Sequence, residues 1–113
     1  MEAAKIPMRL TVTGTVAAGN TLQAVLLIGH PMESGFRTME SGQRVPKNVI
    51  DSVQVFLGSH KLFEMQTGIG ISSNPYMAFP VQLPLPWPSA GLPLRVTWQD
   101  DKSQRGALER VLV

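Results

Sequence analysis

The chain has 113 residues, a length typical of one domain, so a single domain spanning residues 1–113 is expected. Its 43% hydrophobic content predicts a globular protein, and its nine prolines and ten glycines favour turns over long helices. The net charge of +2 is spread along the chain without basic runs interleaved with aromatic residues, which argues against nucleic-acid binding. No cysteine is present, which excludes disulfides, thiolate metal sites and cysteine nucleophiles.

The apolar segments are all short. The longest uninterrupted apolar run, 24–28, is far below the ~20 residues of a membrane-spanning helix. The N-terminal sequence MEAAKIPMRL lacks the basic and apolar regions of a signal peptide. Taken alone, these features predict a cytoplasmic protein that does not contact membranes.

Two strands are predicted in the first thirty residues. Segment 5–13 alternates apolar and polar residues with a period of two, and Pro7 within it favours an edge strand. Segment 21–29 is apolar on both faces, which is typical of a central strand. On its second face, Val25 and Leu27 indicate either tolerated outward aliphatic residues or a surface that meets a partner.

Five further strands follow after a long loop. They are expected at 49–57, 60–65, 76–85, 92–99 and 106–113, with a hairpin turn at Gly58-Ser59. Pro80 and Pro84 favour an edge position for the third of these, and Trp98 is expected in the core. About seven short strands without helical periodicity predict an all-β fold, an antiparallel β-sandwich of the immunoglobulin type.

The loop between the second and third strands, residues 30–48, is unusually long. Compact domains seldom contain a structureless connection of this length unless it serves a function. The loop is polar, rich in turn-forming residues and slightly basic. We therefore expect molecular contacts at or near this loop.

Catalytic chemistry finds little support in the sequence. There is no Gly-x-Ser-x-Gly motif, and Gly68-x-Gly70 is too short for a phosphate-binding loop and leads into no helix. The carboxylates are expected on loops or strand surfaces without partners; they include Glu33, Glu40, Asp51, Asp100 and Asp101. Recognition by loops on a rigid sandwich is the remaining prediction, with no catalytic residue and no cofactor.

A metal site is the alternative. Imidazole and thioether groups suit copper, and His30, Met32 and Met39, with His60 as a further candidate, could supply them. A strong site needs three or four converging ligands, and these residues can equally be ordinary loop residues. A small copper-binding or copper-delivery domain therefore stays open as a second hypothesis.

Two sequence motifs are more specific than the composition. The first is HPMESG at 30–35, followed by G-x-x-VPKNVI at 42–50; the second is GISSNPYMAF at 70–79. Both are similar to motifs of the SoxZ family, the non-catalytic subunit of the SoxYZ carrier in bacterial thiosulfate oxidation. The resemblance extends over nearly the whole chain. Its departures are mild, such as Ser72 and Ser73 where the family commonly has alanine.

The resemblance implies a specific role. The partner subunit, SoxY, carries the pathway intermediates on a cysteine of a C-terminal arm, and SoxZ forms a heterodimer with it. Other Sox enzymes then dock transiently on this pair. Because SoxY supplies the export signal, the resemblance implies a periplasmic protein that is co-exported with its partner, in place of the cytoplasmic prediction.

The same resemblance suggests which residues form the partner or docking surface. Arg37, Arg44 and Lys47 could contact a sulfur-bearing arm or acidic partner enzymes. For Pro31, Gly35 and Pro75 a role in shaping turns competes with a role in contact. The complete predicted surface is His30, Pro31, Met32, Glu33, Gly35, Arg37, Arg44, Lys47, Asn74, Pro75, Tyr76, Val25 and Leu27.

Overall fold

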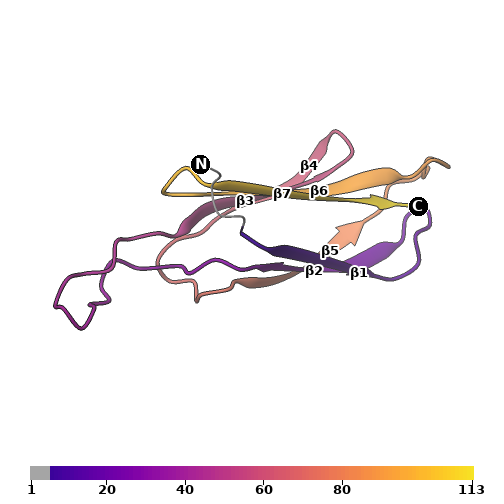
Figure 1. Ribbon diagram of the computed structural model, residues 1–113. Helices are drawn as coiled ribbons and strands as arrows, with labels where there is room; N and C mark the ends of the chain where they lie inside the picture. The colour runs from indigo at the N-terminus through magenta and orange to yellow at the C-terminus, as the bar shows by residue number, and fades with distance from the viewer. Residues whose placement is uncertain (1–5) are drawn as a thin grey trace.

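The computed structural model describes residues 6–113 and shows seven strands in two layers (Figure 1). The strands are β1 (Met8–Thr13), β2 (Thr21–Ile28), β3 (Ile50–Leu57), β4 (His60–Gln66), β5 (Tyr76–Gln82), β6 (Leu92–Asp100) and β7 (Arg105–Leu112). One sheet has the order β1-β2-β5 and the other β4-β3-β6-β7, and all neighbours are antiparallel. The predicted all-β sandwich is confirmed.

The edge and central positions also follow the sequence prediction. β2 lies between β1 and β5, so its apolar second face belongs to a central strand. Pro7 precedes β1, and Pro80 lies in the edge strand β5 opposite Gln23. β5 ends at Gln82 rather than at residue 85, and Pro84 lies beyond its end.

The core forms between the inward faces of the two sheets. Alternate residues of β2, β3 and β6 are buried, as a period of two requires when one face packs on the opposite sheet. Trp98 is 2% exposed and confirms the core position expected for it. No helix among residues 6–113 is long and apolar enough to cross a membrane.

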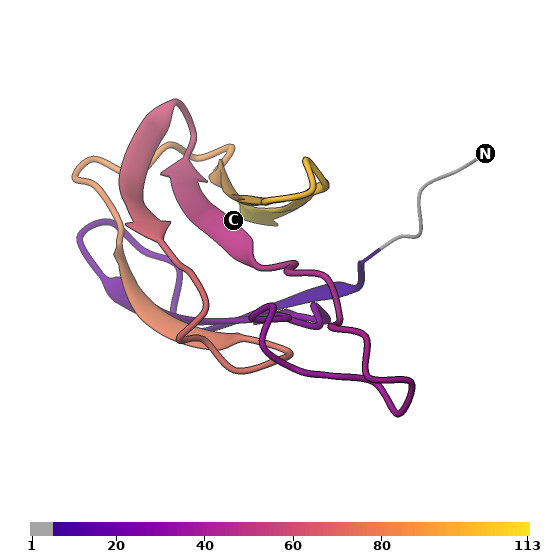
Figure 2. The same cartoon turned by 90° about the vertical axis from the view of Figure 1, so that its left-hand side faces the viewer.

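The two sides of the sandwich are closed differently. On one side β1 approaches β7, and the Arg110 Nη1 group donates a hydrogen bond of 3.2 Å to the carbonyl oxygen of Leu10. β4 and β5 are the edge strands of the two sheets on the other side (Figure 2), and an apolar groove lies between them. The loop 30–48 projects from one end of the sandwich, away from the C-terminus (Figure 1).

Candidate functional site

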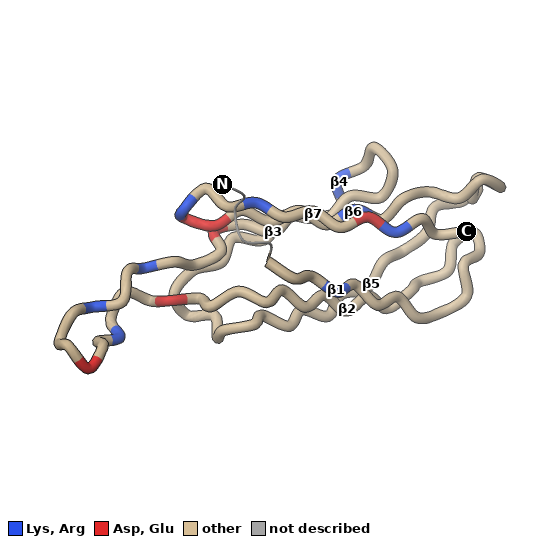
Figure 3. Tube along the Cα trace, viewed as in Figure 1, with Lys and Arg blue, Asp and Glu red and all other residues tan. Residues whose placement is uncertain are grey.

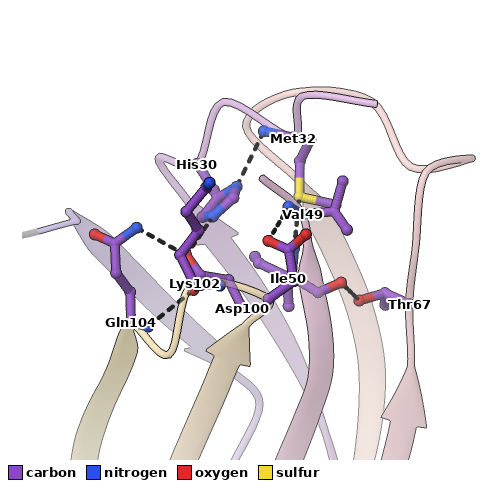
Figure 4. Close-up of polar contacts among 9 residues, drawn as sticks. His30, Met32, Val49, Ile50, Thr67, Asp100, Lys102 and Gln104 are labelled. Carbon is purple, nitrogen blue, oxygen red and sulfur yellow. Dashed lines mark hydrogen bonds and ion pairs between the residues drawn. The ribbon is translucent and has the colours of Figure 1, made fainter. Parts of the chain in front are cut away.

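The base of the long loop is anchored by a buried histidine (Figure 4). The His30 side chain is 0% exposed, and its Nε2 atom lies 3.0 Å from Asp100 Oδ2. Its Nδ1 atom accepts a hydrogen bond of 3.0 Å from the backbone N–H of Met32. An acceptor nitrogen carries no proton, so the network assigns a neutral ring whose Nε2–H group donates to the Asp100 carboxylate.

Asp100 is the centre of this network. Its Oδ1 atom accepts hydrogen bonds from the backbone N–H groups of Lys102 (2.9 Å) and Gln104 (2.8 Å), and the Gln104 amide donates to Oδ2 (2.9 Å). Burial raises the pKa of this carboxyl, but the hydrogen bonds from His30, Gln104 and Lys102 outweigh it. The net pKa lies below the ordinary value of 3.8.

The expected position of Asp100 is therefore wrong. It was expected on the surface without a partner, and it is a buried carboxylate whose partner lies 70 residues away in the chain. Glu33 also has a partner: its carboxylate forms an ion pair with Arg37 at 2.6 Å. The hydrogen bond from Arg37, together with its charge, lowers the pKa of Glu33 against a smaller opposing effect of desolvation.

Met32 belongs to the same anchor. Its side chain is buried, its backbone has a positive φ of 48°, and its sulfur accepts a hydrogen bond of 3.3 Å from the backbone N–H of Ile50. Next to it, the Asp101 carboxylate accepts a hydrogen bond from the N–H of Val49. These contacts join the start of the loop, the start of β3 and the turn after β6 into one packed unit.

The structure does not bring the proposed copper ligands together. His30 and Met32 already use their donor atoms within the anchor, whereas Met39 lies exposed near the tip of the loop. His60 begins β4 at the opposite end of the eight-residue β3, about 25 Å from the loop. Within residues 6–113 there is no group of three or more His, Cys, Asp or Glu side chains placed to hold a metal ion.

The tip of the loop, residues 36–44, is exposed and carries charges of both signs (Figure 3). Two isolated bridges pair its strands, Glu33 with Asn48 and Thr38 with Arg44. Gly35 has a φ of 92°, a value that favours glycine, and Phe36 is 68% exposed. The tip therefore presents an exposed aromatic ring and charges of both signs.

The second loop, residues 67–75, packs beside the base of the first. The N–H of Asn74 donates to the carbonyl oxygen of His30 at 2.8 Å, and Asn74 has a φ of 52°. Pro75 is buried, and Tyr76 is 65% exposed. The two segments that carry the sequence motifs are thus neighbours in space.

Between β4 and β5 lies an apolar groove of about 380 Å³. The rings of Phe63 and Phe79 contact each other edge to face inside it, with centroids 5.1 Å apart. Its other apolar lining residues are Val53, Met65, Ile71, Pro75, Tyr76, Met77 and Ala78. Phe63 is half-buried and Phe79 is 8% exposed. The local sequence carries no signal that this side of the sandwich is open.

The predicted surface residues fall into three groups. Val25 and Leu27 are half-buried on the outward face of β2, away from the groove. The side chains of His30, Met32 and Pro75 are buried, so they can support a contact surface but cannot form its exterior. The exposed or partly exposed members near the two loops are Pro31, Glu33, Gly35, Arg37, Arg44, Lys47, Asn74 and Tyr76.

Comparison with known proteins adds the family. The chain has no match among curated proteins. The model of the family described as "Sulphur oxidation protein SoxZ" matches residues 8–109, nearly the whole chain and all of β1 to β6. The chain therefore belongs to the SoxZ family of sulfur oxidation proteins and has a role in sulfur oxidation through the Sox system.

Proposed function

We propose that the chain is the non-catalytic subunit of a SoxYZ-like carrier, supporting a SoxY-like partner whose C-terminal cysteine holds the sulfur intermediates. The observation that carries this proposal is the apolar groove between β4 and β5, which runs up to the exposed Tyr76 at the start of β5. Contiguous exposed apolar surface of this kind marks protein-protein contact sites.

The groove has the features of a contact centre. Aromatic side chains and methionines line it, and these residue types are enriched where interfaces are most buried. Ile69 and Tyr76 are exposed apolar side chains in the same region. A stable heterodimer buries about 800 Å² on each partner, so the groove would be the centre of a larger contact.

Loop 30–48 supplies the cationic residues of this proposed surface. They are Arg37, Arg44 and Lys47. Charges at the rim of an interface act mainly on the rate and selectivity of association. They suit the transient docking of other Sox enzymes or of a sulfur-bearing arm of the partner.

A non-catalytic role agrees with the use of the buried polar residues. His30 and Asp100 are the two buried polar or charged residues in the described chain, and both are occupied in anchoring the loop. A periplasmic location, reached by co-export with a signal-bearing partner, belongs to the same proposal.

The proposal is tested by co-expression with the SoxY-like subunit from the same source and by affinity capture. Ile71→Asp places a charge in the groove, and Val111→Asp places it at an exposed site on β7. We expect Ile71→Asp to weaken capture by at least ~10-fold and Val111→Asp to leave it unchanged. Circular dichroism checks that both variants are folded.

Two results would contradict the proposal. A folded Ile71→Asp variant that binds the partner like the unmodified chain would remove the groove from the interface. A chain that remains a monomer in the presence of the SoxY-like subunit would refute the carrier role itself. Native mass spectrometry of the captured material gives the stoichiometry, which we expect to be one to one.

A further inference from the structure

A second hollow lies on the outward face of the four-stranded sheet. It has a volume of about 440 Å³, and no carboxylate belongs to its lining. β3, β6 and β7 all contribute to it. The side chains that matter most are Arg95, Arg105, Ser52, Thr97 and Gln99.

The strand register explains why this surface is hollow. Thr97 of β6 lies opposite Ala107 of β7, so two small side chains form the floor. Arg95 precedes Thr97 by two residues on the same face, and Arg105 precedes Ala107 by two residues on β7. Because the strands are antiparallel, the two guanidinium groups flank the floor from opposite ends, each about 7 Å along its strand.

The donors around this floor are unused within the chain. None of the side-chain hydrogen bonds or ion pairs formed between residues 6 and 113 involves Arg95, Arg105, Ser52, Thr97 or Gln99. Such a concentration of unpaired donors, without an acceptor in the lining except for hydroxyl and amide oxygens, favours an anion.

The carboxylates nearby do not occupy the site. Glu64 on β4 is held by Lys61 at 2.6 Å and by Gln54 at 3.0 Å. Glu109 lies opposite Arg95 on β7, but the two side chains form no ion pair. Glu109 reduces the positive potential at the Arg95 end of the hollow, so a preference for an oxyanion over chloride must come from the number and arrangement of the hydrogen-bond donors.

We propose that this hollow binds a tetrahedral sulfur oxyanion, such as sulfate, thiosulfate or an organic sulfonate, between Arg95 and Arg105. The planar guanidinium group offers two parallel N–H donors that match two oxygens of such an anion, and the hydroxyl groups of Ser52 and Thr97 complete the donor set. The choice of sulfur rests on the proposed function, whereas the choice of an oxyanion rests on the hollow itself.

The test uses the isolated, ¹⁵N-labelled chain without any partner, so that its result does not depend on heterodimer formation. Sodium thiosulfate and sodium sulfate are titrated at constant ionic strength with chloride as the balance, and the arginine Nε–H resonances are followed by NMR. We expect saturable shifts of the Arg95 and Arg105 resonances, with Arg9, which lies in the other sheet, as an internal control. Arginine shifts that are absent, or that chloride reproduces, would overturn the proposal.

Variants then identify the arginines. Arg95→Gln and Arg105→Gln should each weaken thiosulfate binding by ~10-fold or more, since each removes a charge-assisted pair of hydrogen bonds. Arg9→Gln, at an exposed position of β1 in the other sheet, is the matched control and should bind as the unmodified chain does. Equal weakening by all three variants would show that binding depends only on the net charge of the protein, and would refute a specific site between Arg95 and Arg105.

The source of the anion is resolved by a pair of peptides. One carries S-sulfocysteine and the other, of the same sequence, carries unmodified cysteine; both are titrated into the same labelled chain. Displacement of thiosulfate only by the S-sulfocysteine peptide, with tighter binding than inorganic thiosulfate, would assign the site to a sulfonate carried by a partner. Tighter binding of inorganic thiosulfate would assign it to the free anion.

Discussion

The base and the tip of the loop 30–48 belong to one segment of sequence but have opposite structural roles. At the base, His30 and Met32 are buried and hydrogen-bonded to residues that lie far away in the chain. At the tip, Phe36 is 68% exposed, and the nearest ion pair, Arg37 with Glu33, is local. A long polar loop can therefore be part of the core at one end and a free surface at the other.

The largest expected effect on stability comes from disrupting the hydrogen-bond network around Asp100 at the base of the loop. Asp100→Asn replaces an oxygen that accepts hydrogen bonds by an NH₂ group that would face the donors of His30 and Gln104. We expect a loss of about 3–5 kcal/mol in the free energy of unfolding, measured by urea denaturation. Asp51→Asn, an exposed position of β3, is the control and should change stability little. Equal stability of the two variants would mean that the buried network does not hold the loop.

A smaller effect is expected from the two methionines of the loop, Met32 at the base and Met39 at the tip. Met32→Ala removes a buried side chain and should cost about 2–4 kcal/mol in the free energy of unfolding. Met39→Ala truncates an exposed side chain near the tip and should cost less than about 0.5 kcal/mol. Thermal unfolding of the two variants under identical conditions compares the base with the tip directly. Similar losses would contradict the distinction.

Acid should weaken the base of the loop through Asp100. The pKa of Asp100 in the folded protein lies below its ordinary value of 3.8, so the contribution of this carboxylate is fully present above the ordinary value. It is lost as the pH falls through the lower, folded-state pKa. We expect Asp100 to add no pH dependence between pH 5 and 8 and to add a decline in stability below about pH 4. In urea denaturation, Asp100→Asn should show a shallower decline in this acid range; an identical slope would contradict the assignment.

The smallest effect on stability is expected at the tip. The double variant Glu33→Gln with Arg37→Gln removes an exposed ion pair, and such pairs contribute little to folding. We expect no measurable change in the urea midpoint, but a slower and less salt-dependent association with the SoxY-like subunit in surface plasmon resonance. A destabilised variant would show that the tip is structural as well.

The strands could be predicted because the local pattern determines them. The alternation in β1, β2, β3 and β6 reflects one buried face, and a single strand already contains that information. The family motifs were informative because they consist of two long strings. The prediction of β5 was three residues too long because an apolar sequence continues beyond the last paired residue, Gln82.

The site could be predicted only in part, because its contacts join distant residues. Nothing in the local sequence around His30 indicates Asp100 as its partner, and a charged residue in a turn-rich segment is usually exposed. The open side of the sandwich and the hollow between Arg95 and Arg105 both depend on sheet order and register. These relations become visible only when the strands are assembled.

Pro80 has a further consequence for the open side of the sandwich. A proline is tolerated in a paired strand where its nitrogen, which carries no hydrogen, faces away from the ladder. In β5 the other neighbour is absent, so Pro80 removes a donor that an incoming strand would need. The groove thus exposes apolar side chains to a partner, while Pro80 hinders the addition of another strand beside β5. A lone chain gains protection against edge-to-edge polymerisation, and the groove still has apolar surface for a folded partner.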